Sequence, residues 1–279
     1  MSVVIPVFNR REQVGRAIES VLAQTRPPEE VIIVDDASGD GTPEAVRRRF
    51  PDVVLLENDR NRGVSHSRNR GVARARGDWV AFLDSDDEWL PAKLARQCEA
   101  LACTDAPPLC HTDEIWIRRG VRVNPRRRHE KRGGDIFEHC LPLCVISPSS
   151  ALLSRDLLDE LGGFDETLPA CEDYDLWLRI CVAHPVCFVP EKLLVKYGGH
   201  ADQLSRRYWG MDRFRVAALG KLLAAGDLDP RRRRAVLAIL IEKLEILHKG
   251  AVKRNRMTQA LAWRAQLDEA RRLERAVAA

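Results

Sequence analysis

The sequence predicts an α/β fold in which helices flank a mainly parallel sheet. In the first hundred residues, four apolar runs alternate with amphipathic segments, at 2–8, 30–38, 53–58 and 79–87. This alternation is typical of βαβ units, whose strands run parallel. The second and fourth runs end in the carboxylates of "DDAS" and "DSDD". Because ligands bind beyond the carboxyl ends of such strands, we expect both acidic ends on one rim of the sheet.

The segments between these runs have the spacing and the boundary signals of helices. Apolar residues recur at helical intervals between 14 and 22. Thr42 and Pro43 are an N-cap and first-turn signal for the second helix. The third is expected over 64–77, where Gly77 ends it, and the fourth runs from Pro91 to about residue 101.

The second half of the chain is less regular, and its predicted elements are strands at 108–117 and 149–154, a basic loop at 119–134, helices at 155–161 and 172–182, and two strands at 186–190 and 193–198. From residue 203 onward the pattern is helical, with one helix starting at Asp229 and Pro230 and the last over 257–275. We therefore expect a domain at 1–200, with halves at 1–100 and 101–200, and a C-terminal helical extension at 201–279.

Composition narrows the class of protein. The 279 residues are 45% hydrophobic, enough for one large domain with an appendage. The net charge of +4 is small against 45 basic and 41 acidic side chains, so the total says little about partners. No apolar run approaches the roughly 20 residues of a membrane span, and no leader is recognisable, so we expect a cytoplasmic protein. The eight cysteines form no C-x-x-C pair and are interpreted as scattered thiols.

The crowded acids of "FLDSDDEW" allow two interpretations. In an extended strand end, Asp84 and Asp86 project their carboxylates to one side, where they repel each other unless they share a proton or a cation. Oxygen ligands of this kind suit Mg²⁺ or Mn²⁺ held jointly with substrate phosphates. The alternative is a solvated turn, in which Asp87 and Glu88 have no further role.

Six motifs occur in order along the first two hundred residues: "VVIPVFNR" (3–10), "VIIVDDASGDGT" (31–42), "NRGVSHSRNRG" (61–71), "FLDSDD" (82–87), "GGFDE" (162–166) and "CEDYDLWLR" (171–179). Together they resemble the nucleotide-sugar transferases of glycosyltransferase family 2, which have a GT-A fold. The resemblance implies an enzyme that uses a nucleoside-diphosphate sugar, with a UDP-linked sugar expected, and Mn²⁺ or Mg²⁺ on the diphosphate.

The resemblance also implies which residues bind the donor. Asp36, beside Asp35, falls where the family binds the nucleoside, although a strand-end aspartate can instead satisfy turn amides at Ser38 and Gly39. Arg68 falls where a basic residue meets the diphosphate. The implied nucleotide-sugar contacts are Pro6, Val7, Phe8, Asp36, Arg68, Asp84, Ser85 and Asp86, and the implied metal ligands are Asp86, Asp84 and His200.

On the acceptor side, the resemblance assigns the catalytic base to Asp173. A carboxylate there removes the proton of the acceptor hydroxyl as it attacks opposite the diphosphate, which gives inversion. Glu172 is a supporting or acceptor-binding group, and Asp165 is a further candidate. First-turn acids also interact favourably with a helix dipole, so a structural role for the Glu172–Asp173 pair stays open. Acceptor recognition is expected within 113–150 and the C-terminal helices.

One departure from the family separates this chain from its processive, membrane-embedded members. Their Q-x-x-R-W element is incomplete here, because Gln203 and Arg206 are followed by Arg207, with a tryptophan only at Trp209. We therefore predict transfer of a single sugar, to a saccharide or lipid-linked acceptor. The alternative is a nucleotide-sugar-binding scaffold without catalysis.

The basic runs 125–132 and 231–234 lack interleaved aromatic residues. They therefore favour a solvated surface, or attraction to the inner face of an anionic membrane, over binding of nucleic acid.

Overall fold

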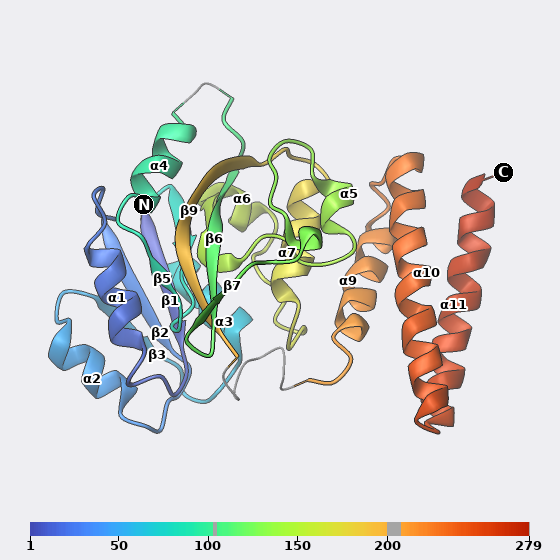
Figure 1. Ribbon diagram of the computed structural model, residues 1–279, viewed down its shortest axis with the longest axis horizontal. Coiled ribbons are helices and arrows are strands. Elements are labelled where there is room, and N and C mark those ends of the chain that lie inside the picture. The colour runs from blue at the N-terminus through green and yellow to red at the C-terminus, as the bar shows by residue number, and fades with distance from the viewer. Residues whose placement is uncertain (103–104, 200–207, 279) are drawn as a thin grey trace.

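The computed structural model describes residues 1–102, 105–199 and 208–278 (Figure 1). In these residues one sheet has the strand order β3-β2-β1-β4-β8-β6-β9-β5, with β7 paired to β6. The strands are β1 (Ser2–Val7), β2 (Glu30–Asp35), β3 (Val54–Glu57), β4 (Trp79–Phe82), β5 (Glu88–Trp89), β6 (Leu109–Arg118), β7 (Val121–Val123), β8 (Ala151–Ser154) and β9 (Cys187–Gly198). The helices are α1 (Val14–Leu22), α2 (Thr42–Arg49), α3 (Val64–Arg74), α4 (Lys93–Ala100), α5 (Phe137–Cys140), α6 (Arg155–Glu160), α7 (Glu172–Cys181), α9 (Asp212–Ala225), α10 (Pro230–Lys253) and α11 (Met257–Ala278), with single 3₁₀ turns η1 (Arg127–His129) and η2 (Pro148–Ser150).

The first four strands form the parallel half of the sheet, as the sequence predicts. β1 pairs in parallel with β2 and β4, and β2 pairs in parallel with β3. Successive residues of β1 point to opposite faces, so Val3 packs with α1, α2 and α4, while Val4 packs with α3 and α7. Gly71 lets α3 approach closely, because a Cβ there would lie 2.3 Å from Val4. The predicted α/β class is confirmed.

The second half of the sheet mixes parallel and antiparallel neighbours. β8 lies antiparallel between β4 and β6, whereas β6 and β9 are parallel. The two strands predicted at 186–190 and 193–198 are one strand, β9, whose register against β6 shifts on either side of Asp113. The strand continues past Pro190, which lies in an exposed stretch beside this irregularity, where a proline is tolerated. The short elements β5, β7 and α5 were not predicted.

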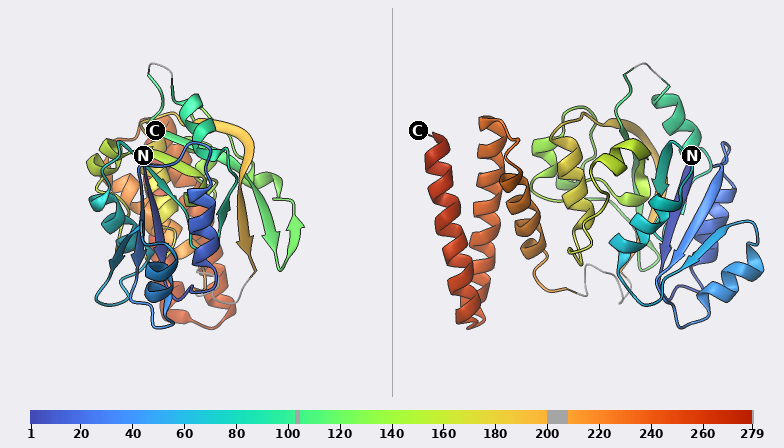
Figure 2. Two further views of the ribbon diagram at one scale, coloured as in Figure 1. Left: turned by 90° about the vertical axis from the view of Figure 1, so that its left-hand side faces the viewer. Right: turned by 180° about the vertical axis from the view of Figure 1, so that it is seen from behind.

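The C-terminal helices α9, α10 and α11 stack side by side at the end of the molecule farthest from α1 and α2 (Figures 1 and 2). α9 lies against α7, and one hydrophobic cluster joins Val4 of β1, Trp177 of α7, Leu219 of α9 and Leu237 of α10. The helical region that the sequence predicts is therefore continuous with the core of the sheet domain. Asp229 caps α10 by accepting from Arg232 N–H, as its position before Pro230 suggests.

Neither a bilayer-spanning helix nor a disulfide occurs in the described residues. No helix there combines the length and apolar character needed to cross a membrane. The seven cysteines that the structure describes are free, as expected from their scattered spacing.

Candidate active site

The carboxyl ends of β1, β2 and β4 lie together on the lower edge of the molecule in Figure 1. The loops after β1 and β2 are joined by hydrogen bonds: Asn9 N–H donates to Ser38 Oγ at 2.8 Å, and Gly39 N–H donates to Asn9 Oδ1 at 2.9 Å. Asp36 N–H donates to Val7 O at 2.8 Å. Pro6 and Val7 are buried there, whereas the Phe8 ring is exposed.

The two aspartates that follow β2 have different surroundings. Both oxygens of buried Asp36 are used within the chain, because Oδ1 accepts from Asn58 Nδ2 at 2.7 Å and from Arg62 N–H at 2.8 Å, and Oδ2 accepts from Gly63 N–H at 2.8 Å. Asp35 Oδ2 accepts from Ser38 N–H at 2.8 Å, so the turn-amide role considered for Asp36 belongs to Asp35. Asp35 Oδ1 is buried without a hydrogen-bond partner, and burial raises the pKa of this carboxyl.

By holding the amides of Arg62 and Gly63, Asp36 fixes the loop from which α3 begins, and α3 carries Arg68. The Arg68 side chain is 3% exposed and joins two acids from distant parts of the chain. Its Nη2 donates to Asp84 Oδ1 and its Nη1 donates to Glu172 Oε1, each at 2.7 Å. Burial opposes the guanidinium charge, but these two carboxylates raise its pKa further.

The acidic turn after β4 is anchored rather than solvated. Asp87 is buried, and its carboxylate accepts from Ser149 Oγ at 2.7 Å and from Tyr197 N–H at 3.1 Å. Burial raises the pKa of Asp87 well above its usual range. The alternative of a solvated turn therefore does not hold for Asp87, since this side chain attaches the turn to β9. Glu88 is half-buried and accepts from Tyr197 Oη at 2.9 Å.

The rest of this turn consists of Asp84, Ser85 and Asp86. Asp84 and Asp86 are half-buried, whereas Ser85 is buried. Burial alone would raise the pKa of Asp84, but Arg68 and Lys196 hold it below its ordinary value. The backbone carbonyl of Asp86 accepts from Arg16 Nη2 at 2.7 Å.

The site contains a cation that the sequence did not reveal. Lys196 lies on β9, and its Nζ donates to Ser147 Oγ at 3.2 Å. Burial opposes its charge, yet Asp87, Glu114, Asp84 and Asp173 raise its pKa. The available signal was a lysine two residues from buried Leu194, on the same side of an apolar strand.

The first turn of α7 brings the second acidic pair to the same cluster. Glu172 is buried against Arg68, and burial and the adjacent Asp173 raise its pKa to about 7 despite that cation. Asp173 is half-buried, and its Oδ1 accepts from Tyr174 N–H at 2.7 Å. Tyr174 and Trp177 are both buried and donate to backbone carbonyls, so they anchor the helix within the core.

Asp165, which was predicted as an acceptor-side residue, does not join this cluster. The carboxylate of Asp165 accepts from Thr167 and is ion-paired with Lys221 of α9 at 2.5 Å. Burial would raise the pKa of Asp165, but Lys221 and Thr167 lower it to about 2, and the side chain links its loop to the C-terminal helices. His200 lies outside the described residues.

A pocket of about 280 Å³ lies in the stretch predicted to recognise the acceptor. Its lining includes Trp116, Arg118, Arg126, Arg128 and His129. Trp116 Nε1 donates to Glu114 Oε1 at 2.6 Å, and Ser147 Oγ donates to the same oxygen at 3.2 Å. Since Ser147 also accepts from Lys196, this pocket is connected to the acidic cluster by consecutive hydrogen bonds.

The acidic turn has the chemistry of a site that shares a divalent cation with a phosphate-bearing ligand. Within the described residues, no three histidine, cysteine or carboxylate side chains are arranged to hold a metal alone. Asp84 and Asp86 are the residues that could offer hard oxygen ligands, since the ion pair of Asp84 with Arg68 uses only Oδ1. One or two carboxylates of this kind fit Mg²⁺ or Mn²⁺ when substrate phosphates complete the coordination.

Comparisons with known proteins all point to the same family. A family model described as "Glycosyl transferase family 2" matches residues 2–162, more than half of the chain, and one described as "Glycosyltransferase like family 2" matches residues 139–225. An "uncharacterized glycosyltransferase" of Nostoc sp. is 39% identical over 198 residues, which are 68% of this chain and 60% of that protein. A Rickettsia felis protein with the same description is 30% identical over 219 residues, which are 74% of this chain. The chain spans only 35% of the length of that Rickettsia protein.

Solved structures share the fold. Staphylococcus aureus TarS 1–349 in complex with UDP-GlcNAc aligns with a TM-score of 0.78 at 18% identity, covering 96% of this chain and 80% of that chain. The mannosyltransferase PcManGT from Pyrobaculum calidifontis, in complex with GDP-Man and Mn²⁺, aligns with a TM-score of 0.62 at 21% identity, covering 96% and 83%. Both alignments include the C-terminal helices and confirm the predicted fold.

Proposed function

The chain belongs to glycosyl transferase family 2, and from this premise we propose that it transfers one sugar from a nucleoside-diphosphate sugar to an acceptor hydroxyl with inversion. The observation that carries the proposal is the ion-pair network of Arg68. This guanidinium joins the acidic turn after β4 to the first turn of α7 through two contacts of 2.7 Å. The two acidic motifs, about ninety residues apart in sequence, are therefore held together by one side chain.

On the donor side, we assign the nucleoside to the edge formed by Pro6, Val7 and Phe8 and the aspartates after β2. Asp35 supports this role better than Asp36, because its Oδ1 is a buried acceptor without a partner. A nucleobase N–H or a ribose hydroxyl is a suitable donor to such an oxygen. A UDP-linked sugar is the expected donor.

Toward the diphosphate, Asp84, Ser85 and Asp86 are the proposed contacts, with Asp84 and Asp86 as the residues that hold Mg²⁺ or Mn²⁺. When bound, such an ion neutralises the charge that develops on the leaving nucleoside diphosphate. Arg68 orients Asp84 and keeps its carboxylate ionised. Lys196 keeps the acids of the site close together before any ligand binds.

Asp173 is the proposed general base. It lies next to Glu172, which is held by Arg68, and it is more exposed than that neighbour. Its carboxylate takes the proton of the acceptor hydroxyl as that oxygen attacks the anomeric carbon. Glu172 acts as a positioning residue through Arg68. The acceptor, a saccharide or a lipid-linked saccharide, is assigned to the pocket beside Trp116, whose ring offers an apolar face with guanidinium groups around it.

The test separates binding from chemistry. A thermal-shift screen of nucleotide sugars with and without Mn²⁺ identifies the donor, because a bound ligand raises Tm. With that donor, Asp173→Asn is expected to retain the thermal shift and to lose roughly 10²–10⁴-fold in turnover. Asp156→Asn, the same change at an exposed position of α6, should alter neither. Binding with no transfer or donor hydrolysis by the wild type would instead support the scaffold.

A further inference from the structure

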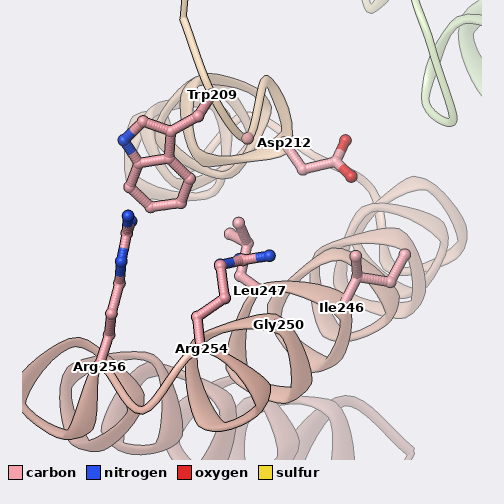
Figure 3. Close-up of a pocket in the computed structure, with 8 residues that line it drawn as sticks. Trp209, Asp212, Ile246, Leu247, Gly250, Arg254 and Arg256 are labelled. Atoms are coloured by element: carbon pink, nitrogen blue, oxygen red, sulfur yellow. The ribbon is translucent and has the colours of Figure 1, made fainter.

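A second pocket lies between the start of α9 and the turn that joins α10 to α11 (Figure 3). Its volume is about 370 Å³, and Leu247 and Gly250 form part of its wall. In Figure 3 the side chains of Leu247 and Arg256 point toward the Trp209 ring, whereas the carboxylate of Asp212 points away. Gly250 leaves room for the guanidinium of Arg254, since a Cβ at this position would lie 2.7 Å from Arg254 Nη2.

Three guanidinium groups surround Trp209. The distances from the ring centroid to the guanidinium carbon are 4.8 Å for Arg256, 5.0 Å for Arg213 and 5.8 Å for Arg254. Among the described residues, none of the three has an ion pair with a carboxylate, and Asp212 is instead paired with Arg215 and Lys243. Like charges gathered without counter-charges favour the binding of an external anion.

The arginines stand on an ordered turn. Arg254 N–H and Arg256 N–H both donate to Ala251 O, at 3.2 and 3.0 Å, and Asn255 takes a left-handed conformation with φ of 55°. His248 Nδ1 lies 3.0 Å from Ala260 O and links the two helices. The positive charge is therefore presented by a defined structure rather than by a flexible tail.

Most of the exposed large apolar side chains lie on the segments that form this pocket, and two of them, Trp209 and Ile246, line it. Trp209 is 41% exposed, and four others from the end of α10 and the start of α11 are 49–68% exposed: Ile246, Val252, Met257 and Leu261. These five are the majority of the eight large apolar side chains that are exposed in the described part of the chain. We call Trp209, the three arginines and these four residues the Trp209 edge. Exposed apolar groups concentrated in this way mark an interaction surface.

The Trp209 edge lies on the same side of the molecule as the carboxyl ends of β1, β2 and β4, at the bottom of both Figure 1 and the right-hand view of Figure 2. The basic run 231–234 lies at the opposite end of α10, where Arg231 pairs with Glu138 and Arg232 pairs with Asp135. That run is therefore a partly paired surface, whereas the three arginines around Trp209 have no ion pair with a carboxylate among the described residues.

We propose that the Trp209 edge binds the surface of an anionic phospholipid bilayer. Tryptophan and exposed aliphatic side chains enter the headgroup region, while arginines meet lipid phosphates, and the two contributions reinforce each other. Each basic residue near an anionic surface strengthens binding roughly fivefold. Bound in this way, the chain faces the membrane with the edge that carries its acidic cluster.

The experiment is vesicle co-sedimentation of the full chain with phosphatidylcholine alone and with phosphatidylcholine containing phosphatidylglycerol. We expect binding to the anionic vesicles only, weakened by salt. Arg254→Glu with Arg256→Glu should weaken it at least tenfold, and Trp209→Ala should weaken it severalfold at unchanged charge. The matched control, Arg231→Glu with Arg234→Glu, has the same charge change and should bind like the wild type.

Several outcomes would overturn the proposal: no binding to anionic vesicles, an equal loss in the matched control, or complete displacement by inorganic phosphate at millimolar concentration, which would indicate a soluble phosphate ligand. Light scattering that shows a dimer lost on Trp209→Ala would assign the surface to a second copy of the chain. Unchanged Tm in each variant shows that folding is retained. Because the assay contains no sugar nucleotide, its failure leaves the proposed transferase function untouched.

Discussion

Lys196 is the residue on which the charge balance of the candidate site depends. It faces Asp84 and Asp87 of the turn after β4, Glu114 of β6 and Asp173 of α7. Buried or half-buried acids are costly to bring together unless a cation lies among them. A single ammonium on β9 therefore stabilises an arrangement that three other elements contribute to, before donor or metal is present.

Replacing Lys196 by methionine should lower the free energy of unfolding by about 1–3 kcal/mol, because the acids around it lose their counter-charge. Urea unfolding at neutral pH measures the change. Lys192→Met, four residues earlier on the same strand but exposed, is the matched control and should change stability by less than about 0.5 kcal/mol. Equal effects of the two substitutions would contradict the assigned role.

The residues of the site were predictable to different degrees. Arg68, Asp84 and Glu172 were indicated by their motifs, and they meet at hydrogen-bonding distance. The sequence could not show whether Asp35 or Asp36 is free to bind a ligand. That depends on which of the two carboxylates accepts hydrogen bonds from the loop 58–63. Lys196 was missed for the same reason, since its neighbours come from parts of the chain more than twenty residues distant.

At the scale of elements, the local sequence correctly predicted the strands of the parallel half of the sheet. Apolar runs of β1, β2 and β4 are buried on both faces, so their composition alone distinguishes them. In β9, Pro190 and the polar residues after it resemble a turn, and only pairing with β6 across a register shift keeps the strand continuous. The length of β9 therefore depends on its pairing with β6, which the local sequence does not specify.

Helix α4 shows how one element contributes a pH-dependent stability. Its first residue, Lys93, is fully buried, with Nζ donating to Gln97 Oε1 at 2.8 Å and lying 4.0 Å from the centroid of the Trp89 ring. Burial lowers the pKa of this ammonium to about 7. From about pH 7 up to the unfolded pKa of about 10.4, the unfolded chain binds a proton that the folded chain lacks. The contribution of Lys93 to stability therefore rises with pH across this window.

Lys93→Met should remove that slope. At pH 7 the substitution is expected to raise the free energy of unfolding by about 1–3 kcal/mol, because no ammonium must be desolvated or deprotonated on folding. Urea unfolding at pH 7 and pH 9.5 tests this, with Lys192→Met as the exposed control. A rise between the two pH values that is as steep in Lys93→Met as in the wild type would show that other groups cause it.

For the whole molecule, the C-terminal helices are attached to the sheet domain by both charge and apolar packing. Lys221 of α9 donates to Asp175 of α7 at 2.8 Å and also pairs with Asp165, while Arg179 donates to Asp175 at 2.9 Å. Lys243 of α10 donates to Pro142 O at 2.7 Å. The sequence indicated a helical region after residue 200, but its helical period could not show that α9 packs against α7.

Because one hydrophobic cluster extends from β1 through α7 to α10, we expect sheet domain and C-terminal helices to unfold in a single transition. Leu219→Ala, a fully buried change in α9, should cost about 2–5 kcal/mol and shift the whole transition to lower temperature. Leu261→Ala, an exposed change in α11, should leave it in place. Scanning calorimetry follows the unfolding of the whole chain. The thermal shift produced by a bound nucleotide sugar follows the sheet domain, so the two measurements together show whether both regions unfold in one transition. If the region after residue 200 were an independent domain, Leu219→Ala would split the transition and spare the nucleotide-dependent step. A single shifted peak would instead mean that packing on α9 stabilises the turn of α7 that carries Glu172 and Asp173.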